Sequence, residues 1–163
     1  MYESQRVWAS FHGGHSAFAD GLGIISQIAE AAVQRGFRAF GFSEHFVKPP
    51  HREFSPGGKV IDNSGEWIDD YVTQVQAAKL RHASHLEILL GIEIEYLRGF
   101  ESWTCQQLAR WPFDYVVGSV HYVHYDDLDI CIDWDRARID EAVRRAGSTE
   151  QLQLDYYEHV MEL

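Results

Sequence analysis

The chain of 163 residues has only two cysteines, Cys105 and Cys131, and no apolar stretch long enough to span a bilayer. Two isolated cysteines exclude a disulfide framework and a Cys-x-x-Cys motif. A membrane helix needs roughly 20 apolar residues, and the longest uncharged stretches here are strand-sized. The first residues also lack the apolar core and cleavage pattern of a signal peptide. These absences predict a cytoplasmic protein with no membrane partner.

Basic residues are scarce as well, with 14 Lys and Arg against 25 Asp and Glu and a formal net charge of −11. Nucleic-acid-binding surfaces are basic, so the sequence predicts no nucleic-acid partner. An anionic substrate stays compatible with this charge, because bound cations would dominate the field of a site. The length predicts one domain covering residues 1–163.

What the chain does contain is a repeated pattern of a short apolar run followed by a segment with helical spacing. The expected strands are Val7–Phe11, Ala39–Ser43, Leu86–Ile94 and Tyr115–Val120. The expected helices are Ile24–Arg35, Glu66–Ala83, Phe100–Arg110, Arg136–Arg145 and Glu150–Leu163, the last with Ser148 or Thr149 as N-cap. Four successive βα units predict an α/β fold whose parallel sheet is open or curls toward a barrel.

Six potential metal ligands follow or close the apolar runs. They are His12, His15, Asp20, His45, Glu93 and His121. Side chains at the ends of neighbouring parallel strands meet in one crevice, where α/β folds carry out their chemistry. Imidazoles and carboxylates together suit a borderline to hard divalent cation such as Zn²⁺, Mn²⁺ or Fe²⁺. This set predicts a metallohydrolase.

Each candidate also has a structural alternative. His12 and His15 flank Gly13 and Gly14, and residues three apart on a strand face opposite sides. Both rings converge only if the glycines let the chain bend, and otherwise they belong to a polar turn. Asp20 could instead cap the helix that follows it.

Two carboxylates on one apolar strand, Glu93 and Glu95, are spaced by two residues and therefore share a face. They are costly there unless paired or metal-bound. For Glu93 we favour a metal ligand. For Glu95 we favour a salt bridge with Arg98 or Arg110. His45 and His121 each close a strand, where a single histidine is more often structural.

Two loops adjoin the expected site. The loop after the second strand carries Lys48, His51 and Arg52, of which Arg52 is the candidate for contacting an anionic substrate and Lys48 is expected at the solvated surface. The segment Tyr122–Trp134 is expected to be a loop over the mouth of the site. Its carboxylates, expected to face solvent, are Asp126, Asp127 and Asp129.

The motifs, taken in order, resemble those of the PHP (polymerase and histidinol phosphatase) family of metal-dependent phosphoesterases. The strings are HGGHSAFADG, GFRAFGFSEH, LLGIEIEY and FDYVVGSVHYV. They are most similar to the histidinol-phosphatase branch, although most relatives have one residue between the first two histidines. The resemblance implies a distorted (β/α)₇ TIM-like barrel with two or three divalent ions (Zn, Mn or Fe).

The same resemblance assigns roles to single residues. His12 and His15 match the first histidine pair, and Glu93 matches the catalytic glutamate that bridges two metals. Three further residues match metal ligands, namely Asp20, His45 and His121. The family's later motifs, a histidine on a later strand and an Asp-x-His, have no counterpart, so we expect about the first half of the family barrel.

The implied reaction is hydrolysis of L-histidinol phosphate to L-histidinol and phosphate, a step of histidine biosynthesis. The alternative is a truncated, catalytically inactive PHP remnant that binds metal or acts as a subunit of an assembly. Six of the roughly nine groups of a three-metal site are present. The expected partners are a small phosphorylated substrate and further copies of the chain that cover the open barrel edge.

Overall fold

The computed structural model describes residues 8–49, 64–126 and 128–163. The elements, in chain order, are β1 (Trp8–Ser10), α1 (Ile25–Gln34), β2 (Phe37–His45), α2 (Trp67–His82), β3 (Glu87–Glu95), α3 (Glu101–Leu108), β4 (Tyr115–Ser119), β5 (Tyr122–Tyr125), β6 (Leu128–Cys131), α4 (Arg136–Ala146) and α5 (Thr149–Glu162). They group into two compact units. The first comprises Met1–Phe46, Ile61–Glu93 and Trp111–Val117, and the second comprises Val47–Val60, Ile94–Arg110 and Gly118–Leu163.

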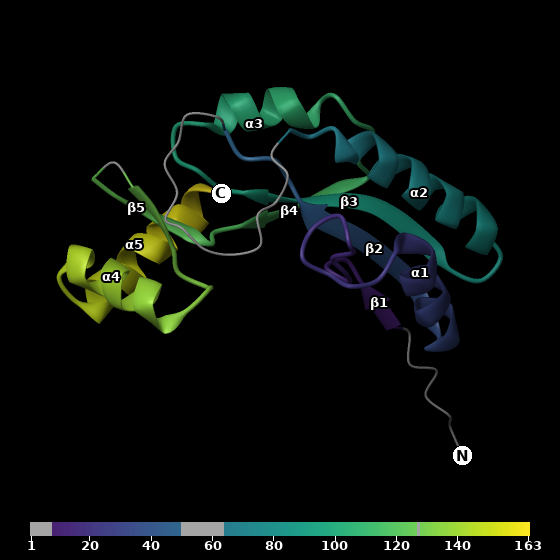
Figure 1. The fold of residues 1–163 in the computed structure, drawn as a ribbon, viewed down its shortest axis with the longest axis horizontal. Coiled ribbons are helices and arrows are strands. Elements are labelled where there is room, and N and C mark those ends of the chain that lie inside the picture. The colour runs from purple at the N-terminus through teal and green to yellow at the C-terminus, as the bar shows by residue number, and fades with distance from the viewer. Residues whose placement is uncertain (1–7, 50–63, 127) are drawn as a thin grey trace, which may run out of the picture. The chain divides into compact units, whose positions relative to one another are not determined.

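Strands β1 to β4 form one sheet in the order β1-β2-β3-β4. β1 pairs with β2, and β2 with β3, in parallel (Figure 1). The intervening helices make this the parallel α/β arrangement that the sequence predicts. The register between β2 and β3 places His45 opposite Glu93, so two predicted ligands stand side by side at the ends of neighbouring strands.

The core of the first unit lies between the sheet and helices α1 and α2, which pack against each other. Alternate strand residues point into it, among them Phe42 on β2 and Leu90 on β3, both fully buried. Each such side chain stabilises the fold by roughly 1.5–3 kcal/mol. The residues between them, including Ser43 and His45, belong to the opposite face of the sheet.

Tyr115 of β4 lies across that opposite face. Its hydroxyl donates hydrogen bonds to the carbonyl oxygens of Phe11 at 2.6 Å and Phe42 at 3.0 Å. Gly41 and Gly91 make room for it, because a Cβ at either position would overlap the tyrosine side chain. The tyrosine therefore ties the segment just after β1 to β2.

The second unit contains an antiparallel hairpin of β5 and β6. The prediction of a loop over Tyr122–Trp134 is therefore wrong for most of that segment. Val123 and Ile130 are paired in the hairpin and fully buried, and they pack against Ala142 and Leu152. Burial of these apolar side chains outweighs the acidic composition that suggested an open loop.

Helices α4 and α5 follow the hairpin and are separated by Gly147, whose φ of 91° is the left-handed conformation that ends a helix. Ser148 is confirmed as the N-cap of α5, because its side chain accepts a hydrogen bond from the backbone N–H of Gln151. Asp135 caps α4 in the same way, accepting from the N–H of Arg138. Local cap chemistry thus sets these helix starts.

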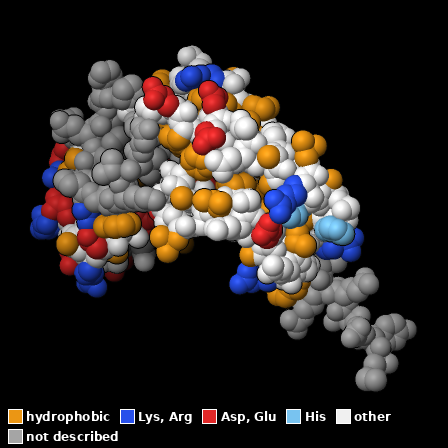
Figure 2. Space-filling model, turned by 45° about the vertical axis from the view of Figure 1, so that its right-hand side comes forward, with side chains coloured by type: hydrophobic (Ala, Val, Ile, Leu, Met, Phe, Trp, Pro, Cys, Tyr) orange, Lys and Arg blue, Asp and Glu red, His pale blue; other side chains and the backbone are white. Residues whose placement is uncertain are grey.

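Among the residues that the structure describes, no helix combines the length and the apolar character needed to cross a membrane. On the face drawn in Figure 2, acidic and basic side chains are interspersed among apolar ones.

Candidate metal centre

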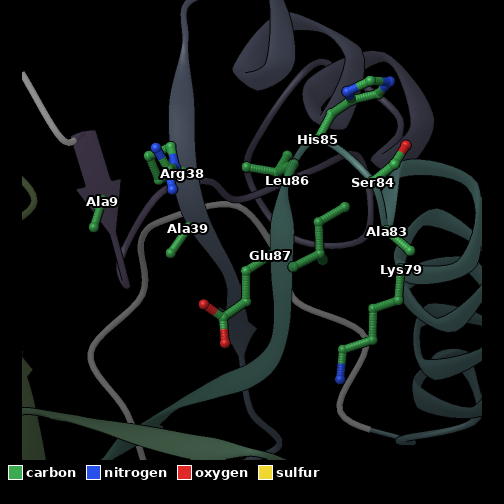
Figure 3. Close-up of a pocket in the computed structure, with 10 residues that line it drawn as sticks. Ala9, Arg38, Ala39, Lys79, Ala83, Ser84, His85, Leu86 and Glu87 are labelled. Carbon is green, nitrogen blue, oxygen red and sulfur yellow. The ribbon is translucent and has the colours of Figure 1, made fainter. Parts of the chain in front are cut away.

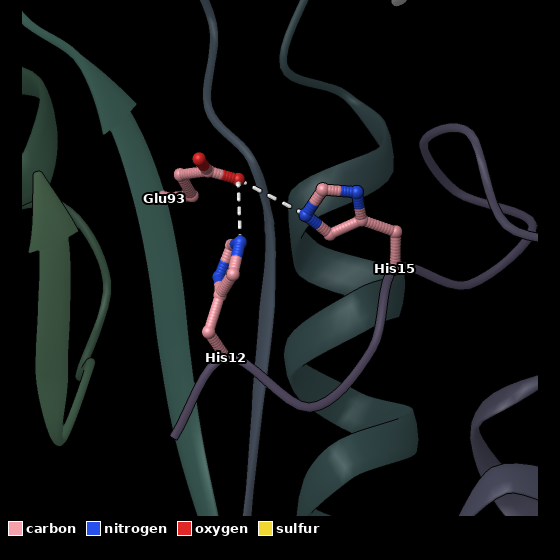
Figure 4. A group of neighbouring side chains, drawn as sticks. All are labelled: His12, His15 and Glu93. Atoms are coloured by element: carbon pink, nitrogen blue, oxygen red, sulfur yellow. Dashed lines mark hydrogen bonds and ion pairs between the residues drawn. The ribbon is translucent and has the colours of Figure 1, made fainter. Parts of the chain in front are cut away.

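The loop after β1 brings two histidine rings to one carboxylate. His15 Nε2 lies 3.0 Å from Glu93 Oε2, and His12 Nε2 lies 3.8 Å from the same oxygen (Figure 4). The two rings meet edge to face, with centroids 5.4 Å apart. The loop runs close to the sheet, because a Cβ on Gly13 would come within 2.7 Å of the Phe40 ring. The predicted bend at the two glycines is present.

Asp20 and His45 complete this group in the first unit. Asp20 Oδ1 lies 2.5 Å from His15 Nδ1, and His45 Nδ1 lies 3.2 Å from Glu93 Oε2. His45 Nε2 is 3.7 Å from Asp20 Oδ2. Asp20 does not cap α1, whose N-cap is Ile24 with no side-chain cap bond. Within the first unit, the structure therefore brings together five predicted ligands.

Glu93 is a buried carboxylate whose side chain is only 3% exposed. Its hydrogen bond to His15 is the largest cause that raises the pKa of that imidazole to about 9, against the opposing effect of burial, and Asp20 adds to the rise. The protein without metal thus holds a proton at His15 that a cation would have to displace.

Two further residues of this unit support the site, and the sequence reasoning missed both roles. The Oγ of Ser43, which is fully buried, lies 2.9 Å from His12 Nδ1. Glu44 accepts a hydrogen bond from the backbone N–H of Ser16 at 2.7 Å, and burial raises the pKa of its carboxyl. Ser43 and Glu44 directly precede His45 in the string SEH. This position next to a predicted ligand is the sequence signal that could have indicated both roles.

His121, the sixth predicted ligand, belongs to the second unit, where it is held by Glu95. The backbone N–H of His121 donates to Glu95 Oε1 at 2.8 Å, and its ring Nδ1 lies 2.9 Å from Glu95 Oε2. The sequence suggested Arg98 or Arg110 as partners of Glu95. Arg98 forms an ion pair with Glu162. The contact of Glu95 with His121 was not foreseen.

The predictions for residues of the two expected loops differ in outcome. His51, Arg52 and Asp127 lie outside the described residues, so the predicted role of Arg52 stays a prediction. Lys48 is half-buried and donates a hydrogen bond to the Tyr122 hydroxyl at 2.6 Å, and burial lowers its pKa. The sequence instead predicted Lys48 at the solvated surface.

The acidic hairpin residues differ from one another. Asp129 is buried and bonded to His124 Nδ1 at 3.0 Å, so the prediction that it faces solvent is wrong. Asp126, with a side chain 82% exposed, does face solvent.

The donor chemistry suits divalent metal ions. Ligand atoms of His12, His15 and Glu93 lie within 4.8 Å of one another, and the same holds for His15, Asp20 and His45. Imidazole nitrogens with carboxylate oxygens form a typical donor set for Zn²⁺, Mn²⁺ or Fe²⁺. The residues present therefore fit the cofactor that the sequence predicts.

A separate hollow of about 660 Å³ lies at the start of β2 and β3, lined by Arg38, Lys79, His85 and Glu87 among others (Figure 3). None of the predicted ligands lines it. It is at the opposite ends of these strands from His45 and Glu93, so it is not part of the metal centre.

Comparison with known proteins matches residues 12–163 to the PHP domain family. A Schizosaccharomyces pombe protein named "Probable histidinol-phosphatase" is 30% identical over 86% of this chain and 46% of its own length. A histidinol-phosphatase of Bacillus subtilis is 27% identical over 83% of this chain and 52% of its own. The chain thus spans about half the length of the curated relatives it matches.

Two solved structures share the fold. A Listeria monocytogenes protein named "putative histidinol phosphatase" has a TM-score of 0.73 and 23% identity, covering 93% of this chain and 57% of that one. A Lactococcus lactis histidinol phosphate phosphatase, solved with zinc, L-histidinol and phosphate, has a TM-score of 0.60 and 18% identity over 85% of this chain and 51% of its own. These likenesses confirm the fold class, a partial TIM-like barrel of parallel βα units.

Proposed function

Because the chain belongs to the PHP domain family, we propose that it is a metal-dependent phosphomonoesterase that hydrolyses L-histidinol phosphate to L-histidinol and phosphate. The observation that carries the proposal is the convergence of His12, His15 and His45 on the buried carboxylate of Glu93. The zinc, L-histidinol and phosphate in the Lactococcus lactis neighbour support this choice of cofactor and substrate.

We assign the ions to two groups of ligands. His12 and His15 would hold one ion together with Glu93, and Asp20 and His45 would contribute to a second. Glu93, whose Oε2 also lies 3.2 Å from His45 Nδ1, would act as the bridge between the two ions. His121 of the second unit is proposed as a further ligand, in keeping with two or three ions in all.

When bound, the divalent ions would act as Lewis acids that offset charge on the phosphate oxygens and lower the pKa of a water. The chain's own residues set where this happens. Glu93 and His45 stand on paired strands, so their separation is fixed by the sheet and not by a loop. Ser43 holds the ring of His12 through its Nδ1.

A place in histidine biosynthesis and a cytoplasmic location belong to the same proposal. So does self-association, since β4 stands at the edge of the four-stranded sheet and an exposed strand edge favours pairing with another chain.

A second candidate function is a catalytically inactive PHP remnant that binds metal or serves as a subunit of an assembly. One observation favours it, namely that the chain spans about half the length of its curated relatives. The two candidates differ in turnover and agree in metal binding, so one experiment separates them.

The deciding experiment measures phosphate release from L-histidinol phosphate by the purified chain after loading with Zn²⁺ or Mn²⁺. We expect turnover, reduced by about 100-fold or more in His45→Ala, which removes a ligand, and in Glu93→Gln, which removes the charge of a ligand. Matched controls are His85→Ala and Glu87→Gln, which change exposed residues at the start of β3 and should keep the wild-type rate. A folded, metal-loaded chain without turnover would contradict the phosphatase and favour the remnant.

A further inference from the structure

The end of β3 and the segment after β4 meet within the second unit through one carboxylate. Glu95 is the last residue of β3, two positions beyond Glu93, and its side chain is 7% exposed. Both of its oxygens contact the same residue. Oε1 accepts the backbone N–H of His121 at 2.8 Å, and Oε2 lies 2.9 Å from the ring Nδ1.

The backbones on either side are also tied together, so this contact is held in place. Ser119 Oγ donates to the carbonyl oxygen of Ile94 at 2.9 Å, and the N–H of Tyr96 donates to the carbonyl oxygen of Ser119 at 2.8 Å. These bonds bracket Glu95 and fix its position relative to His121. A buried carboxylate is costly without such hydrogen bonds, and His121 supplies two of them.

The chemistry of the contact distinguishes the two ring nitrogens. An ionised carboxylate only accepts hydrogen bonds, so beside the ionised form of Glu95 the ring places its hydrogen on Nδ1. In a neutral imidazole the lone pair is then on Nε2, and a metal ion binds an imidazole through that lone pair. A second carboxylate stands on that side, since Asp133 Oδ2 lies 3.7 Å from Nε2 and its other oxygen accepts from the Cys131 thiol at 2.9 Å.

We propose that Glu95 is a positioning residue that orients the His121 ring and makes Nε2 its metal-coordinating nitrogen. The inference rests on the proposed function, because that function gives His121 its role as a ligand. Carboxylates that orient a ligating histidine contribute to metal affinity without touching the metal.

The test is Glu95→Gln, a change that keeps the size of the side chain but leaves one acceptor where two are needed. The amide can accept the His121 backbone N–H only by turning its NH₂ group toward Nδ1, which moves the ring hydrogen to Nε2. Long-range nitrogen–proton NMR of histidine-labelled, metal-free protein shows directly which ring nitrogen carries the hydrogen. The His121→Gln variant serves to assign the signal.

We expect the neutral His121 ring of the wild type to carry its hydrogen on Nδ1. In Glu95→Gln we expect the hydrogen on Nε2 or shared between both nitrogens, and zinc affinity about 10- to 100-fold lower by chelator competition. Glu87→Gln is the matched control, since it makes the same change at the exposed start of the same strand and should alter neither readout.

A wild-type ring with its hydrogen on Nε2 would overturn the proposal, and so would a folded Glu95→Gln variant with unchanged tautomer and zinc affinity. If Glu95→Gln does not fold, the wild-type spectrum alone decides. Absence of histidinol phosphate turnover, together with the expected tautomer and the weakened zinc binding, would reject the proposed function and support this inference.

Discussion

At the scale of single residues, Glu93 organises the first unit's site. Its oxygen Oε2 lies within 3.0 to 3.8 Å of three imidazole nitrogens, from His12, His15 and His45. A carboxylate buried to this extent is stable only with partners that supply positive charge or hydrogen bonds. In the protein without metal, His15 meets part of that need by holding a proton.

This proton predicts a pH dependence of metal binding. The pKa of His15 is raised from 6.5 to about 9, first by its hydrogen bond to Glu93. In the metal-free protein its contribution to stability is therefore fully present below about pH 6.5 and is lost as pH rises through about 9. Metal binding must expel the proton, so we expect apparent zinc affinity to increase with pH up to about 9.

Calorimetry at neutral pH, in two buffers with different ionisation enthalpies, measures the protons released on zinc binding. We expect the same release in His85→Ala, which alters an exposed histidine away from the site. Zinc binding without proton release would show that His15 is neutral before the metal arrives.

At the scale of elements, the site depends on the path of one loop over one sheet. The loop from β1 to α1 carries His12, His15 and Asp20, and the backbone N–H of Gly13 bonds to the carbonyl oxygen of Gly41 on β2 at 3.3 Å. Strands β2 and β3 present the remaining ligands by their register. Because the loop lies close to the sheet, the ligands on the loop and the ligands on the strands come together.

The two glycines of this loop are predicted to differ in importance. A Cβ on Gly13 would come within 2.7 Å of the Phe40 ring, which is itself buried, whereas a Cβ on Gly14 would make an ordinary 3.6 Å contact with Ile28. We expect Gly13→Ala to cost about 1–3 kcal/mol of stability and to weaken zinc binding. Gly14→Ala is the matched control and should change neither.

Denaturant unfolding and zinc titration of the two variants measure these effects. Equal losses in both variants would mean that the loop needs glycine for backbone freedom at each position. Wild-type behaviour of Gly13→Ala would mean that the loop does not lie tightly on β2.

At the scale of the whole molecule, the chain is a PHP domain that covers about half the length of its curated relatives. Five proposed ligands come from the first unit and His121 from the second. The proposed metal ligands therefore come from segments that are far apart in the chain. An ion that binds only the folded state stabilises it by an amount that grows with the logarithm of the free ion concentration once this exceeds the dissociation constant.

We accordingly expect zinc to stabilise the protein by about 2.7 kcal/mol when its free concentration is 100 times the dissociation constant. Thermal unfolding with zinc, and again after adding a chelator, measures the difference. The gain in stability from zinc should shrink in Glu93→Gln and persist in Glu87→Gln. Light scattering measures the mass in solution and so tests the proposed self-association. An unfolding temperature that does not respond to zinc would contradict a structural role for the metal.

Several features were predictable because local pattern determines them. The strands around Phe42 and Leu90 follow from continuous apolar runs, and the start of α5 follows from Ser148 at its N-cap. The hairpin of β5 and β6 was not predictable in this way. Its strands are only four residues long and lie in a segment rich in aspartate, and the burial of Val123 and Ile130 depends on helices that come later in the chain.

The sequence by itself determined the parallel α/β class and the candidate ligands, since strand and helix periodicity and the position of a polar residue at a strand end are local properties. Only the tertiary structure decided which atoms meet. It brought His12, His15, Asp20, His45 and Glu93 into one group, placed Ser43 on His12 and paired Glu95 with His121. Most of these contacts join residues at least 26 positions apart, and they depend on strand register and loop path, which no local pattern encodes.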